Sequence, residues 1–140
     1  MKVFIISIEE ENSPRLNNFL SQPFFAKSDL HYTKLGVKGG ELSAKQYFEL
    51  AVKGRSQPLS PSELGCSLSH MAALKKFLET NNEYALILED DALIPDELTI
   101  TLLEGELKKQ IFGYEIFAEN SNIPFQKYKK DIARQLKLIR

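Results

Sequence analysis

The chain has 140 residues, 43% of them hydrophobic and 26% charged, and this size and composition fit one globular domain with little room for a second. Its formal net charge of -1 excludes the strong overall field that would recruit nucleic acid or an anionic membrane. The charge is uneven, because residues 121–140 carry six Lys or Arg and one Asp, which leaves a net charge of -6 on the first 120 residues.

The sequence shows no targeting pattern. Its first apolar run ends in three glutamates, whereas a signal peptide has a longer apolar stretch and a small-residue cleavage site. No run approaches the roughly 18 apolar residues of a membrane span. A single cysteine, Cys66, excludes an intramolecular disulfide and a zinc site built from several cysteines. We therefore expect a soluble, cytoplasmic protein that does not bind nucleic acid.

The N-terminal region predicts a strand followed by a helix. Residues 3–8 (VFIISI) are apolar apart from Ser7 and rich in β-branched side chains, which is typical of a strand covered on both faces in a parallel sheet. Ser13 and Pro14 then provide the N-cap and the first position of a helix. Residues 30–35 alternate in polarity and predict a second strand. The turn predicted after it contains glycines that permit positive φ, namely Gly36, Gly39 and Gly40.

Two later helix starts match the capping box of Ser, two residues, then Glu or Gln, at residues 43–46 and 60–63. The second helix is expected to run to about residue 80, with an apolar face formed by Leu64, Leu68, Ala72, Leu74 and Phe77. Residues 84–88 (YALIL) predict a buried strand, and Pro95 predicts the start of another helix. This alternation implies an α/β fold with a mainly parallel sheet and flanking helices.

Glu89, Asp90 and Asp91 follow the third predicted strand directly and form the first candidate site. Ligands collect at the carboxyl ends of strands in open α/β sheets, and carboxylates there can hold Mn²⁺ or Mg²⁺ with phosphate oxygens in the remaining positions. Such an ion would offset the charge of a diphosphate leaving group. The alternative is a solvated acidic loop that ends the strand, and the triplet alone favours that alternative.

Two motifs that occur in a fixed order along the chain favour the metal site over the solvated loop. Residues 59–70 (LSPSELGCSLSH) precede residues 86–91 (LILEDD), and together with the N-terminal VFIISI and SPR they resemble glycosyltransferase family 25, the lipopolysaccharide and lipooligosaccharide glycosyltransferases. The resemblance covers about residues 2–100. It implies a nucleotide-sugar-binding domain of the GT-A type, which is Rossmann-like. It also implies transfer of a hexose, often galactose from UDP-galactose, to a growing glycan.

The resemblance implies roles for five residues of the donor site. Asp91 is the first choice as ligand of Mn²⁺ or Mg²⁺ and Glu89 the second, while Asp90 contacts the donor sugar or ribose. Ser7 and Arg15 match the family's N-terminal donor-site segment, and an arginine pairs well with a diphosphate. An exposed helix arginine explains Arg15 equally well.

Three further candidates lie on the helix predicted from residue 60. His70 follows Glu63 by seven residues, about two helical turns, so the two are candidate catalytic residues beside Asp90 and Asp91. Each also has a structural explanation, which is the capping box for Glu63 and a packed, hydrogen-bonded ring for His70. For Cys66 we favour packing in the core.

The resemblance is weakest after Asp91, where the remaining 49 residues contain no stretch that we can match to the family's C-terminal region. Family members are usually longer, so we expect a truncated chain that lacks the C-terminal half and with it the catalytic base or part of the acceptor site. Two functions stay open. One is a hexosyltransferase that acts on a lipooligosaccharide or lipopolysaccharide glycan acceptor. The other is an inactive remnant or nucleotide-sugar-binding module of the same family.

We divide the chain into a nucleotide-sugar-binding α/β domain, residues 1–104, and a divergent C-terminal strand and basic amphipathic helix, residues 105–140, packed on the same domain. The helix pattern permits peripheral contact with the cytoplasmic face of the inner membrane, where a lipid-linked acceptor would lie. We favour instead an apolar side that packs on the sheet or on a second subunit. An open sheet edge would favour a homodimer.

Overall fold

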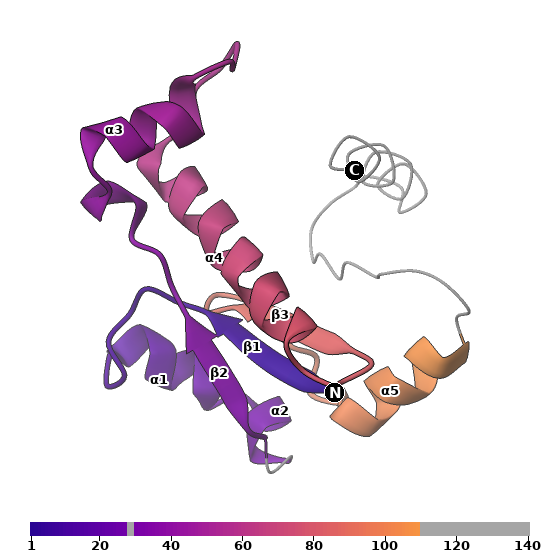
Figure 1. Cartoon of the computed structure of the whole chain (residues 1–140). Coiled ribbons are helices and arrows are strands. Elements are labelled where there is room, and N and C mark those ends of the chain that lie inside the picture. Colours follow the sequence, from indigo (N-terminus) through magenta and orange to yellow (C-terminus); the bar gives the residue numbers. More distant parts are fainter. Residues whose placement is uncertain (28–29, 110–140) are drawn as a thin grey trace. The chain divides into compact units, whose positions relative to one another are not determined.

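The computed structural model describes residues 1–27 and 30–109. Three parallel strands form a sheet in the order β2-β1-β3, and helices cover both of its faces (Figure 1). β1 (Lys2–Ile6) is central, with β2 (Tyr32–Leu35) on one side and β3 (Ala85–Glu89) on the other. The predicted α/β class with a parallel sheet and flanking helices is confirmed.

The connections between the strands carry helices of very different length. α4 is the longest of the described helices, whereas η1 is a 3-10 turn and η2 a π-helical turn. In chain order the helices are α1 (Pro14–Leu20), α2 (Pro23–Ala26), η1 (Gly39–Glu41), α3 (Ala44–Tyr47), η2 (Phe48–Val52), α4 (Pro61–Leu78) and α5 (Ile100–Lys109).

Alternation along β1 sorts its side chains onto two faces of the sheet. Ile5 packs with Leu16 of α1 in a core that also takes in residues of α2 and α5. Phe4 and Ile6 pack with Ala73 of α4 in a second core. Because neighbouring residues of a strand point to opposite faces, α1 and α4 lie on opposite sides of the sheet.

Side-chain caps fix where the helices begin. The Ser13 Oγ accepts a hydrogen bond from the Leu16 N–H at 3.1 Å. The Ser60 Oγ accepts from the Glu63 N–H at 3.2 Å, while the Glu63 carboxylate accepts from the Ser60 N–H at 2.7 Å. The capping boxes predicted at Ser43 and Ser60 are both present.

The loop after β2 runs close to the end of β1 and the start of α4, and glycines make this approach possible. A Cβ atom on Gly36 would lie 2.0 Å from the Ser7 carbonyl oxygen, and one on Gly39 would lie 1.8 Å from the Pro61 carbonyl oxygen. The glycines of this loop do not use the positive φ that they permit; among the described glycines, positive φ occurs at Gly54. Lack of space, rather than backbone conformation, requires glycine at these positions.

α4 completes this contact with small residues of its own. A Cβ atom on Gly65 would lie 2.6 Å from the Val37 carbonyl oxygen. One turn later the Ser69 Oγ accepts a hydrogen bond from the Val37 N–H at 2.8 Å. The buried side of α4 therefore passes through Gly65, Ser69 and Ala73, and the predicted apolar face is wrong at Leu74, which is 46% exposed. The buried side of α4 thus combines the apolar Leu64 and Ala73 with Gly65 and Ser69, which allow close backbone approach.

The helix predicted from Pro95 begins later, at Ile100. Pro95 opens a turn instead, in which its carbonyl oxygen accepts a hydrogen bond from the Leu98 N–H at 3.0 Å. The Thr99 Oγ1 then accepts from the Leu102 N–H at 3.2 Å and caps the helix. The helix therefore starts after the N-cap residue Thr99 and not at Pro95, although proline and acidic residues also favour a helix start.

The strand and basic helix predicted beyond residue 110 lie outside the described residues, so the division at residue 104 and the membrane or dimer contacts of the tail stay predictions. Within residues 1–27 and 30–109, no helix combines the length and the apolar character needed to cross a membrane.

Candidate functional site

The carboxyl edge of the sheet brings two distant parts of the chain together. Ile6 at the end of β1 is in register with Glu89 at the end of β3. The pairing continues past the strands, because the Asp90 N–H donates to the Ile6 carbonyl oxygen at 3.2 Å. Ser7 and Asp90 therefore follow neighbouring strand ends, and the predicted donor segment and acidic block share one edge of the sheet.

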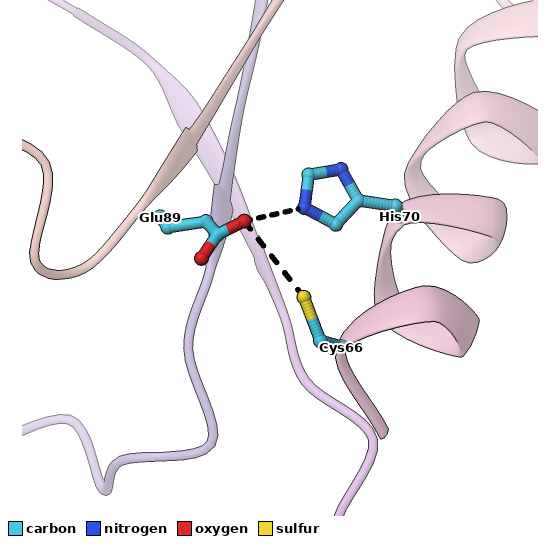
Figure 2. A group of neighbouring side chains, drawn as sticks. All are labelled: Cys66, His70 and Glu89. Atoms are coloured by element: carbon cyan, nitrogen blue, oxygen red, sulfur yellow. Dashed lines mark hydrogen bonds and ion pairs between the residues drawn. The ribbon is translucent and has the colours of Figure 1, made fainter. Parts of the chain in front are cut away.

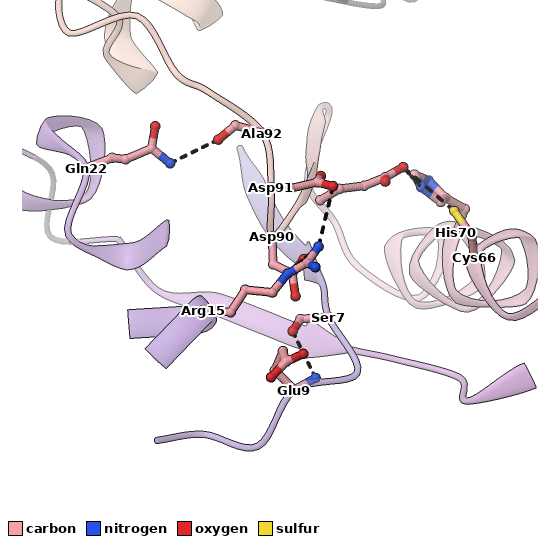
Figure 3. A network of polar contacts seen from close by, with 10 residues as sticks. Ser7, Glu9, Arg15, Gln22, Cys66, His70, Asp90, Asp91 and Ala92 are labelled. Carbon is pink, nitrogen blue, oxygen red and sulfur yellow. Dashed lines mark hydrogen bonds and ion pairs between the residues drawn. The ribbon is translucent and has the colours of Figure 1, made fainter. Parts of the chain in front are cut away.

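Arg15 and Asp90 form the shortest of the described ion pairs at this edge. The Arg15 Nε donates to the Asp90 Oδ1 at 2.8 Å, and a terminal nitrogen of the same guanidinium lies 2.6 Å from that oxygen (Figure 3). The Asp90 side chain is only 8% exposed, whereas that of Arg15 is 53% exposed. The hydrogen bond to Asp90 and the charge of Asp90 raise the pKa of Arg15 above its usual value. A buried carboxylate thus holds a half-exposed cation at the strand end.

Asp91 is the carboxylate that faces solvent. Its side chain is 69% exposed, and its Oδ2 lies 3.4 Å from the same terminal nitrogen of Arg15. Carboxylate oxygens suit Mg²⁺ and Mn²⁺, and an exposed group can reach a bound ligand. Asp90 is buried against Arg15, so Asp91 is the more accessible of these two neighbouring acids, and its role as a metal ligand stays a prediction.

Glu89 points to the opposite face of the sheet from Asp90. Its Oε1 lies 3.0 Å from the His70 Nε2 and 3.8 Å from the Cys66 Sγ, both on α4 (Figure 2). Strand alternation explains the split, since Glu89 ends β3 on the face that α4 covers and Asp90 faces α1. The three consecutive acids therefore belong to two separate groups: Asp90 and Asp91 contact Arg15, and Glu89 contacts Cys66 and His70. That Glu89 and Asp91 bind the same cation stays a prediction.

Cys66 is exposed, so the expectation that it packs in the core is wrong. It lies one turn before His70 on α4, which directs both side chains toward Glu89. Partial desolvation of the sulfur, followed by the charge of Glu89 and the hydrogen bond to it, raises the pKa of the Cys66 thiol. The four-residue spacing of Cys66 and His70 is the sequence signal that could have indicated this contact.

The pH dependence of alkylation tests this environment, and the absence of any second cysteine makes the label unambiguous. The thiolate is the nucleophile, so a raised pKa predicts slower reaction with iodoacetamide at neutral pH than for an unperturbed cysteine. Glu89→Gln removes the negative charge and is expected to move the midpoint of the pH–rate profile to lower pH. Glu97→Gln, which alters an exposed acid in the following loop, is the control. An unchanged profile in Glu89→Gln would show that the Glu89 carboxylate does not contribute to the raised pKa of Cys66, which would then rest on desolvation.

Glu63 has a structural role in the described contacts. The hydrogen bonds from the backbone and then the side chain of Ser60 lower the pKa of the Glu63 carboxyl, as expected for a capping carboxylate. The structure assigns it the cap of α4, and its role in catalysis stays a prediction, as does that of His70. Ser7 is buried, and its Oγ accepts a hydrogen bond from the Glu9 N–H at 3.1 Å (Figure 3).

Gln22 is a positioning residue that the sequence did not reveal. Its Nε2 donates to the Ala92 carbonyl oxygen at 3.0 Å (Figure 3). Its Oε1 accepts from the Ile94 N–H at 2.9 Å. These two hydrogen bonds tie the loop after Asp91 to the end of α1. A lone glutamine in a polar segment carries no pattern that predicts such a contact.

Comparison with protein-family models supplies the remaining evidence. The model of glycosyltransferase family 25 (LPS biosynthesis protein) matches residues 1–140. Neither a curated protein nor a solved structure matches the chain. The family match extends past residues 2–100, over which the motifs carried the resemblance, and takes in the C-terminal segment as well. Since it spans the sequence from end to end, the chain belongs to glycosyltransferase family 25.

Proposed function

We propose that the chain transfers a hexose, galactose from UDP-galactose, to a lipooligosaccharide or lipopolysaccharide glycan. Family membership implies a glycosyltransferase of lipopolysaccharide biosynthesis with a nucleotide-sugar donor and a glycan acceptor. The observation that carries the proposal is the grouping of Arg15, Asp90 and Asp91 at the carboxyl edge of a parallel sheet. This edge is where open α/β sheets bind nucleotides.

Arg15 is the proposed contact to the donor diphosphate. Asp90 engages the Nε and one terminal nitrogen, and the guanidinium has five N–H donors in all, so further donors remain for phosphate oxygens. The half-exposed side chain places these donors at the surface, while buried Asp90 fixes their direction. Charge-assisted bonds from a held arginine suit a diphosphate better than a mobile lysine would.

Asp91 is the proposed ligand of Mn²⁺ or Mg²⁺ at the same edge. A divalent cation there would offset negative charge on the departing nucleoside diphosphate. The exposed Asp91 carboxylate contributes oxygen ligands of the kind that these ions prefer, and its proximity to Arg15 brings both positive charges to one diphosphate.

Calorimetry and a transfer assay test the proposal together. We expect the protein to bind UDP in the presence of Mn²⁺, and Asp91→Asn to weaken that binding by about tenfold or more, since a charged metal ligand contributes about 1.4 kcal/mol or more. With UDP-galactose and a lipooligosaccharide preparation, the wild type should add one hexose to the glycan, detected by mass spectrometry. UDP-glucose and UDP-N-acetylglucosamine are the competing donors.

Glu97→Gln provides the matched control, because it removes an exposed carboxylate from the loop that follows Asp91. It should bind UDP as the wild type does. Equal binding by Asp91→Asn and wild type would rule out the metal role of Asp91. Binding of UDP-galactose without any glycan product would favour the alternative of a nucleotide-sugar-binding module and refute the transferase.

A further inference from the structure

Cys66, His70 and Glu89 form a second group of metal-ligating side chains, distinct from the Arg15 group. One possible ligand atom from each residue lies within 4.8 Å of the other two. Figure 2 shows all three side chains converging on the space between α4 and the end of β3. Sulfur and imidazole nitrogen are ligands that Mg²⁺ and Mn²⁺ disfavour and that Zn²⁺ accepts readily.

The distances suit a tetrahedral ion. With metal–ligand bonds of about 2.0–2.3 Å, a tetrahedral zinc site places its nitrogen and oxygen ligands about 3.4 Å apart and its sulfur and oxygen ligands about 3.6 Å apart. The corresponding separations are 3.0 Å for His70 Nε2 to Glu89 Oε1 and 3.8 Å for Cys66 Sγ to Glu89 Oε1. Side-chain shifts of a few tenths of an ångström would bring the two separations from the Glu89 oxygen to these values, and the Cys66 and His70 ligand atoms lie within 4.8 Å of each other.

The backbone already holds these ligands in place. Cys66 and His70 are four residues apart on a helix with a complete capping box, so they share one face of a regular segment. Glu89 is the last residue of β3, whose ladder with β1 extends through Asp90. No loop has to close to assemble the group. The His70 and Glu89 side chains are 37% and 49% exposed, which gives an ion a path from solvent.

We propose that Cys66, His70 and Glu89 bind Zn²⁺, or a cation of similar preference, at a site separate from the donor site. Three protein ligands leave the fourth tetrahedral position for a water molecule or another small ligand. The ion would link α4 to the end of β3, on the opposite side of the sheet from Arg15. Glu89 would then belong to this site, and Asp91 would serve the donor cation without it.

Zinc and cobalt titrations of the full chain, freed of metal and without nucleotide, test the site. We expect one Zn²⁺ per chain by calorimetry. Co²⁺ should give a sulfur-to-metal charge-transfer band and the intense visible bands of tetrahedral geometry. Cys66→Ser should abolish the charge-transfer band. Both His70→Gln and Glu89→Gln should weaken Zn²⁺ binding by at least about tenfold to 100-fold. Loss of a residue that only hydrogen-bonds to a metal ligand already lowers metal affinity by that much.

Two controls separate this site from a surface histidine and from the donor site. His31→Gln removes the other histidine of the chain and should leave Zn²⁺ binding unchanged. Asp91→Asn should also leave it unchanged while weakening UDP binding. Zn²⁺ affinity unaltered in Cys66→Ser, or a cobalt spectrum without the sulfur band, would overturn the proposal. Circular dichroism of each metal-free variant checks that the fold is intact, so loss of binding is not loss of structure.

Discussion

Gly39→Ala is expected to lower the free energy of unfolding by about 3 kcal/mol, the upper end of the usual cost of overpacking. The added Cβ would lie 1.8 Å from the Pro61 carbonyl oxygen and 2.9 Å from the Gly65 backbone nitrogen. Both obstacles are backbone atoms at the start of α4, so no side chain can rotate away. Relief requires the loop after β2 to separate from α4. Urea denaturation followed by circular dichroism measures the change.

Gly40→Ala is the matched control one residue further along the chain. A Cβ atom on Gly40 would meet nothing within 4 Å. This substitution is expected to leave stability unchanged or raise it slightly, because alanine restricts the unfolded chain more than glycine does. Equal stabilities of the two variants would show that the loop does not press against α4 as the structure describes.

Arg15→Ala is expected to weaken the binding of UDP by about 10-fold to 150-fold while leaving the binding of uridine unchanged. The first effect follows from the loss of charge-assisted hydrogen bonds to the diphosphate, which contribute about 1.5–3 kcal/mol. The second follows because uridine has no phosphate for the guanidinium to contact. Calorimetry with both ligands in the presence of Mn²⁺ measures the difference directly.

Arg15→Lys and Arg55→Ala complete this experiment. Lysine keeps the positive charge without the planar fork, so an intermediate loss of UDP affinity is expected. Arg55 is exposed and donates to the Leu50 carbonyl oxygen, and its removal should leave UDP binding unchanged. If Arg15→Ala weakened UDP and uridine equally, Arg15 would act through the position of Asp90 and Asp91 and not through the diphosphate.

Local sequence patterns predicted most of the elements because their causes are local. The caps at Ser13, Ser43 and Ser60 depend on side chains three residues from the groups they bond, and all three are present. The apolar runs at residues 3–8 and 84–88 likewise predicted the two strands that carry the candidate site. The start of α5 was missed because two local signals compete there, the Pro95 turn and the Thr99 cap, and their order of strength is not evident from composition.

The buried face of α4 could not be predicted in the same way. Its contact with the loop after β2 depends on the backbone approach of Gly39 to Pro61 and of Gly65 to Val37. Neither segment alone shows that the other lies against it. Hydrophobicity placed Leu64 on the buried side correctly, but it also placed Leu74 there, which is 46% exposed. Gly65 and Ser69 are buried instead, because only small residues let the two backbones come so close.

The sequence by itself determined the α/β class, the family and the place of the acidic block, since strand patterns and the two ordered motifs are properties of short segments. The tertiary structure decided which acid does what. Strand alternation turns Glu89 toward Cys66 and His70 on α4, and Asp90 toward Arg15 on α1, because the two helices cover opposite faces of the sheet. Which side chains lie near a strand end depends on which helices pack on each face of the sheet there. For that reason three adjacent carboxylates form two separate groups.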